Sequence, residues 1–98
     1  MIVPTSAEGN DDVWHLYVVR VPDRDRVLSA MQSAGIGVGI RYPTPIHLTA
    51  AFAGLNHDRG SFPVSEDAAR SILSLPMYPH ITPKAQDYVA GVLMSALC

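Results

Sequence analysis

Three side chains that can bind an anionic, hydroxyl-rich ligand lie close together in the sequence: Arg41, Tyr42 and His47. An arginine guanidinium can form paired hydrogen bonds with a phosphate or a carboxylate, and a tyrosine hydroxyl or histidine nitrogen can bond to a sugar oxygen. Pro43 and Pro45 lie between Tyr42 and His47. Because proline fixes its own φ angle and restricts the preceding residue, we expect this loop to project its polar side chains in a fixed direction.

Each of these residues also has a purely structural interpretation. Arg41 could lie in solvent at a strand end, Tyr42 could pack, and His47 could bond to carbonyl groups of its own loop. Other chemical motifs are missing from the sequence. The four histidines and the single cysteine do not have the spacing of metal ligands, the glycines at 35–39 lack the spacing of a dinucleotide-binding turn, and no serine lies in a nucleophile-elbow context.

Composition narrows the class of protein. The chain has 98 residues, enough for one domain, and its net charge of −2 comes without a basic stripe, which argues against nucleic acid as a partner. Only 16% of residues are charged, against about 25% in a typical soluble domain, so another domain or subunit could cover part of the surface. Cys98 has no intrachain partner for a disulfide, and no apolar run approaches the ~20 residues that span a membrane. We therefore expect a cytoplasmic protein.

Hydrophobic periodicity and turn residues predict a small α/β fold, with helices packed on a layer of short strands in the order β-α-β-loop-α-β-α. Residues 1–12 are polar and rich in turn residues, and we expect them to form a flexible segment ahead of a domain over 13–98. The expected elements are a strand over 13–21, a helix capped by Asp23 that runs to Ala34, a strand over 36–41, a short helix over 49–55 capped by Thr49, a helix that begins near Ser61 or Pro63, a strand over 74–78, and a helix from Thr82 to Leu97.

The helical stripes are specific predictions about which side chains are buried. Val27 and Met31 lie on one face of the first long helix, with Gly35 at the position after its end where a positive φ is common. The last helix has its apolar face at residues 89–97. For the middle helix, apolar residues recur every four positions in two series, which predict its buried face: Val64, Ala68 and Ile72, and also Ala69 and Leu73.

Four motifs in order make the chain recognisable. They are 14–21 (WHLYVVRV), 35–48 (GIGVGIRYPTPIHL), 62–66 (FPVSE) and 73–79 (LSLPMYP), followed by the final helix. Together they cover about residues 13–97 and resemble the C-terminal small domain of the DegT/DnrJ/EryC1/StrS aminotransferases. The resemblance implies the C-terminal fold of the fold type I enzymes that use pyridoxal phosphate. It also implies transfer of an amino group, usually from glutamate, to a keto-sugar that is often nucleotide-linked.

The resemblance also implies what this chain would need from elsewhere. In the family, the lysine that binds pyridoxal phosphate lies in a large N-terminal domain, and the enzymes are dimers with active sites at the subunit interface. The only lysine here, Lys84, matches no catalytic position. We therefore expect no catalytic residue in this chain, and we expect Arg41, Tyr42 and His47 to bind the substrate.

Two alternatives remain open from the sequence. One is a non-catalytic remnant or an interaction module that pairs with another aminotransferase subunit. A weaker one is an independent small-molecule sensor.

Overall fold

The computed structural model describes all 98 residues. Its order is β-α-α-β-α with two 3-10 helices between the first two α-helices. The elements are β1 (Tyr17–Arg20), α1 (Arg24–Ser33), η1 (Ile46–Leu48), η2 (Ala50–Leu55), α2 (Pro63–Ser71), β2 (Ile72–Leu75) and α3 (Pro83–Leu97). The predicted fold class, short strands with helices packed on them, is confirmed.

The sheet consists of two antiparallel strands, β1 and β2, and its centre is the middle of the core. Val19 lies opposite Leu73, and both side chains are buried. β1 is shorter than the predicted strand because the chain takes a positive φ of 31° at Trp14 and becomes regular only at Tyr17. β2 begins earlier than predicted, at Ile72, whose backbone is already extended.

The predicted strand over 36–41 is wrong. The structure has a single isolated bridge there: the amide of Ser74 donates to the carbonyl of Gly39 at 2.7 Å, and the Gly39 amide donates back at 3.2 Å. Glycines in this segment supply no side chain to pack against the sheet, which weakens strand formation. A second bridge joins the first residues to the sheet, because Ile2 exchanges two hydrogen bonds with Arg20, at 2.8 and 2.9 Å.

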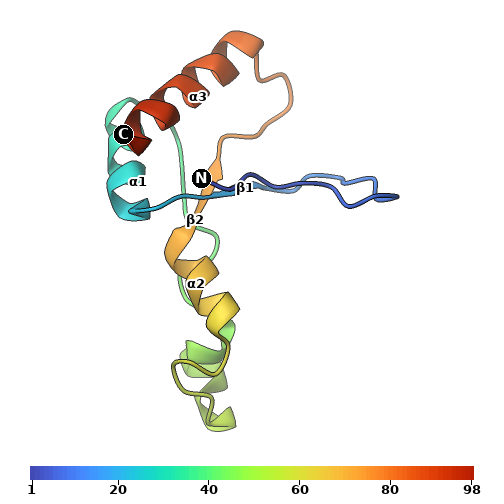
Figure 1. Cartoon of the computed structure of the whole chain (residues 1–98), viewed down its shortest axis with the longest axis vertical. Coiled ribbons are helices and arrows are strands. Elements are labelled where there is room, and N and C mark those ends of the chain that lie inside the picture. The colour runs from blue at the N-terminus through green and yellow to red at the C-terminus, as the bar shows by residue number, and fades with distance from the viewer.

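Helices α1 and α3 pack against each other (Figure 1), α1 also contacts β2, and both helices contribute residues to the core. The predicted stripe on α1 is confirmed, since Val27 and Met31 are fully buried, and Gly35 has the expected positive φ of 76°. Asp23 stands at the start of α1 without capping it; its carboxylate instead accepts a hydrogen bond from Arg26.

Helix α3 begins as predicted. The Thr82 side chain accepts a hydrogen bond from the Ala85 amide, and Pro83 occupies the first turn, where a missing amide hydrogen costs nothing. The helix buries Leu93 and Ala96. The apolar face predicted for α3 is therefore confirmed.

Helix α2 agrees with its prediction only in part. Val64, expected on the buried face, is 78% exposed, and Ile72 belongs to β2 rather than to the helix. The helix buries Ala69, which belongs to the second predicted series, and Glu66, which belongs to neither. The helical period was assigned correctly, but the run of apolar residues that suggested it continued into the strand.

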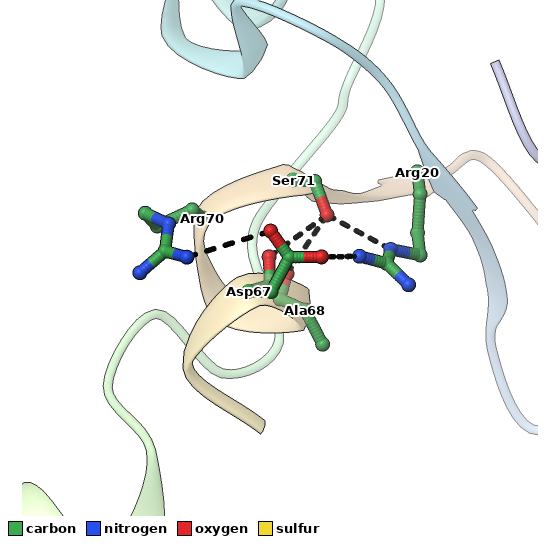
Figure 2. A network of polar contacts seen from close by, with 5 residues as sticks. All are labelled: Arg20, Asp67, Ala68, Arg70 and Ser71. Carbon is green, nitrogen blue, oxygen red and sulfur yellow. Dashed lines mark hydrogen bonds and ion pairs between the residues drawn. The ribbon is translucent and has the colours of Figure 1, made fainter. Parts of the chain in front are cut away.

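An ionic contact fastens α2 to the sheet (Figure 2). Arg20 on β1 forms an ion pair with Asp67 and donates a second hydrogen bond to the Ser71 hydroxyl at 2.9 Å. The Ser71 hydroxyl in turn donates to main-chain carbonyls one helical turn back. This arrangement joins the helix at both its Asp67 and Ser71 positions to one strand.

The molecule is elongated rather than spherical (Figure 1). Its extents are 48 × 36 × 22 Å and its radius of gyration is 15.5 Å, against about 13 Å for a compact chain of this length. The accessible surface is 6983 Å², whereas a compact chain of this mass exposes about 5,500 Å². The core occupies one end, while α2 and both 3-10 helices project away from it; its residues are Val19, Val21, Val27, Met31, Ile36, Leu73, Leu93 and Ala96.

No helix combines the length and the apolar character required to cross a bilayer.

Candidate functional site

Arg41 and Tyr42 lie together on the surface, as their exposure shows. Tyr42 is 75% exposed, and Arg41 is also exposed and takes part in none of the ion pairs of the structure. The peptide bond between them is cis. Both side chains are therefore free to contact a ligand or a partner surface.

His47 has a different environment from the other two predicted site residues. Its side chain is only 8% exposed, and Nε2 lies 3.1 Å from Oε1 of Glu66 on α2. An ionised carboxylate can only accept hydrogen bonds, so Nε2 is the donor. The ring of Phe62 packs edge-on against the imidazole, with centroids 4.8 Å apart. The histidine is thus bonded to a helix rather than to its own loop.

Glu66 connects three parts of the chain. Its Oε1 accepts the Gly60 amide hydrogen at 2.7 Å as well as the His47 contact, and the residue is 7% exposed. Burial of the carboxylate opposes ionisation. Hydrogen bonds from Gly60, His47 and the Phe62 backbone, together with attraction to His47, outweigh burial and lower the pKa of Glu66 below its usual value.

Two contacts therefore flank the segment that carries Arg41 and Tyr42. On one side, Gly39 exchanges backbone hydrogen bonds with Ser74 of β2; on the other, His47 bonds to Glu66 of α2. The residues between these anchors include two prolines, which limit the remaining backbone freedom. The structure thus positions the segment at both of its ends.

Neither of the two main concavities of the isolated chain is suited to a sugar nucleotide. The one beside this loop has a volume of about 160 Å³, with Thr44, Arg59 and Glu66 in its wall, and known small-molecule sites exceed about 300 Å³. A larger groove of about 460 Å³ runs between Tyr17, Leu75 and α3, but ten of its twelve lining residues are hydrophobic and none is charged. A site for an anionic sugar at Arg41 therefore requires an opposing surface.

Comparison with known proteins gives the family. A model of the DegT/DnrJ/EryC1/StrS aminotransferase family matches residues 1–94. The chain belongs to this family. It is 42% identical over 91 residues to the erythromycin biosynthesis sensory transduction protein EryC1 of Saccharopolyspora erythraea, an alignment that covers 93% of this chain and 25% of that protein. It is also 43% identical over 79 residues to dTDP-3-amino-3,4,6-trideoxy-alpha-D-glucose transaminase of Streptomyces venezuelae, covering 81% of this chain and 21% of that protein.

Solved structures agree with the sequence comparison. The fold matches a DegT DnrJ EryC1 StrS aminotransferase from Brucella abortus with a TM-score of 0.89 at 34% identity, covering 98% of this chain and 26% of that one. It matches S. venezuelae DesV with a TM-score of 0.86 at 40% identity, covering 97% and 26%. The chain thus spans about a quarter of the length of its relatives. The resemblance to the C-terminal part of sugar aminotransferases is confirmed.

Family membership implies pyridoxal phosphate, so the chain's own residues must be tested against that group. The cofactor in such enzymes needs a lysine that forms an imine and moves protons. Lys84 lies exposed in the first turn of α3 and lines neither concavity. The residues of this chain do not by themselves fit the cofactor, and no chemical step can be derived from them alone.

Glu66 was not predicted as a site residue. An acidic residue in the first turn of a helix usually interacts favourably with the helix dipole while exposed to solvent, and its sequence position gave no other indication. Only its place at the end of the motif FPVSE, one of the four motifs shared with the family, could have indicated that Glu66 has a role. That it is buried under the His47 loop depends on contacts between residues far apart in the chain.

Proposed function

We propose that this chain is the substrate-holding C-terminal part of a pyridoxal-phosphate-dependent sugar aminotransferase that transfers an amino group, from glutamate, to a nucleotide-linked keto-sugar. Residues 13–98 would be the small domain, with residues 1–12 leading into it. A large domain or subunit would supply the lysine and most of the cofactor site. The complete enzyme would be a cytoplasmic homodimer.

One observation supports this proposal most strongly. Nearly the whole chain superposes on the Brucella abortus aminotransferase and on DesV, and within that match Arg41 and Tyr42 are exposed on an anchored loop. An arginine in that position can pair with a phosphate or a carboxylate in bidentate fashion. The tyrosine hydroxyl can bond to a sugar oxygen. The Nε2 atom of His47 is already bonded to Glu66 and is not available to a substrate. We propose that His47 contributes to substrate binding by holding the loop.

A domain exchange tests the proposal. Residues 1–98 replace the matching C-terminal segment of the S. venezuelae transaminase, and transfer of an amino group from glutamate to that enzyme's keto-sugar is measured. We expect the chimera to be active and the same enzyme truncated before the exchanged segment to be inactive. A chimera that folds and binds pyridoxal phosphate but transfers no amino group would contradict the proposal.

A second function is favoured by the excess of exposed surface. The chain exposes about 1,500 Å² more than a compact protein of its mass, which is close to the area of a standard protein interface. A non-catalytic module that pairs with another aminotransferase subunit would use the same surface. Binding to a complete family enzyme, without any contribution to activity in the chimera, would favour this alternative.

A further inference from the structure

We propose that Glu66 is a positioning residue. One of its carboxylate oxygens, Oε1, holds the loop between His47 and Gly60 against α2, a contact that we call the clip. The clip thereby fixes the orientation of Arg41 and Tyr42 towards the substrate. The inference rests on the proposed function, since it assigns Glu66 to the site that those two residues form. Glu66 itself is buried and does not contact the substrate in this arrangement.

The clip closes a long stretch of irregular chain at two points. Between Gly39 and α2 there is no strand, and η1 and η2 are short 3-10 helices that contribute no residue to the hydrophobic core. Such a segment has few contacts to hold it and would otherwise open locally at little cost. Oε1 of Glu66 joins its His47 position and its Gly60 position to the same atom, at 3.1 and 2.7 Å.

The clip is also shielded from water. The side chains of His47 and Glu66 are 8% and 9% exposed, and the Phe62 ring covers the imidazole. Hydrogen bonds to a charged group are stronger in such surroundings than in solvent. Loss of the carboxylate would leave the Gly60 amide and the His47 ring without a partner, a larger effect than loss of an exposed ion pair.

The helix that carries Glu66 is itself held in place. Arg20 joins α2 to β1 through Asp67 and Ser71, as Figure 2 shows. At the other side, the Arg24 guanidinium donates to the carbonyls of Ala69 and Ile72, at 3.1 and 3.2 Å. These contacts hold α2 in place independently of Glu66, so we expect loss of the Glu66 carboxylate to loosen the loop and not the helix.

The first experiment measures amide hydrogen exchange on the 98-residue chain. Glu66→Ala is expected to speed exchange at Gly60 and at Leu48 and Thr49 at least about tenfold, with α3 unchanged. Glu66→Gln is expected to retain most protection, because its amide oxygen can still accept both hydrogen bonds. Glu8→Ala, which removes an exposed glutamate, is the matched control and should change nothing.

A second variant separates the clip from general loss of stability. His47→Leu removes only the His47 end of the clip, because leucine cannot donate a hydrogen bond to Glu66, so we expect faster exchange at Leu48 and Thr49 with Gly60 still protected. If Glu66→Ala also speeds exchange in α3, the variant has lost stability as a whole. The His47 variant then tests the clip, through faster exchange at Leu48 and Thr49 with Gly60 still protected. Unchanged exchange at the loop in both variants, or equal acceleration at Gly60 in both, would overturn the inference.

The second experiment uses the chimera described above. Glu66→Ala is expected to raise KM for the keto-sugar nucleotide about tenfold, which corresponds to about 1.4 kcal/mol, with kcat changed less than about threefold. Glu66→Gln should restore KM to within about threefold of the unmodified chimera. A loosened loop with unchanged KM would overturn the positioning role; an inactive unmodified chimera would instead refute the proposed function, which keeps the two failures distinct.

Discussion

Leu73 belongs to the buried cluster that the sheet, α1 and α3 form together, so its truncation gives a direct measure of the core. It is fully buried at the centre of β2, opposite Val19, within a cluster of eight buried residues. Leu73→Ala removes three carbon atoms and leaves a cavity, and such changes cost about 2–5 kcal/mol. The cost should approach about 3 kcal/mol or more here, because Leu73 is fully buried in this cluster and close packing limits collapse into the space.

That cost is large relative to the whole. A chain of 98 residues has a free energy of unfolding of about 5–15 kcal/mol, and with 11 residues buried this one should lie near the lower limit. The assay is urea unfolding followed by circular dichroism. With a slope of about 1.5 kcal/mol/M, the midpoint should fall by about 2 M.

Leu55→Ala is the matched control, since Leu55 is 61% exposed in η2 and its truncation should change stability by less than about 0.5 kcal/mol. Equal midpoint shifts for the two variants would refute the view that the core lies between the sheet, α1 and α3. A loss below about 1 kcal/mol for Leu73→Ala would refute it as well.

Three further outcomes are expected from the same unfolding assay. Because the pKa of Glu66 is lower in the folded chain than in the unfolded one, its ionisation adds stability above its usual pKa of about 4.5, and this contribution disappears as the pH falls through the folded value. The stability difference between wild type and Glu66→Gln should therefore shrink as the pH falls below about 4.5, and a constant difference would contradict the assignment. Arg20→Ala should lower the free energy of unfolding by about 1 kcal/mol, because the pair with Asp67 is partly exposed. Arg26→Ala breaks a surface pair and should lower it by less than about 0.5 kcal/mol. Equal losses of stability would show that α2 is not held through Arg20. Gly35→Ala should lower the free energy of unfolding by about 1–2 kcal/mol because its φ is 76°, although no atom lies within 4 Å of the added carbon. Gly91→Ala inside α3 should raise it by up to about 1 kcal/mol, because alanine favours a helix over glycine. A gain of stability in both variants would contradict the backbone conformation at Gly35.

The sequence was sufficient to predict the parts of the fold that depend on local pattern. The helical period predicts the stripe through Val27 and Met31, and the residue types at helix ends predict the positive φ at Gly35 and the cap at Thr82. All three are present. These features involve residues within a few positions of one another. Local sequence therefore determines them.

The errors have a common physical cause. Ile72 was assigned to a helix because apolar residues continue through it at helical spacing, but pairing with β1 places it in a strand. The segment around Gly39 reads as a strand, yet only one bridge forms there. The partner that decides each case lies more than thirty residues away in the chain, and a local pattern carries no information about it.

The candidate site shows the same division. Arg41 and Tyr42 were predicted from residue type and from the prolines beside them, and their role in binding substrate stays a prediction. His47 was considered for a contact with substrate or with loop carbonyls, and its actual partner is Glu66 of α2. That contact joins residues nineteen positions apart and could not be inferred from spacing.

The central claim, that this chain supplies the substrate-binding loop of a sugar aminotransferase, is tested most directly by KM for the keto-sugar nucleotide in the chimera. Arg41→Ala would remove a charge-assisted contact of about 1.5–3 kcal/mol, so we predict a rise in KM of about 10- to 100-fold. Arg26→Ala, which removes an exposed arginine from α1, should leave KM unchanged. The same KM for both variants and for the unmodified chimera would contradict the claim.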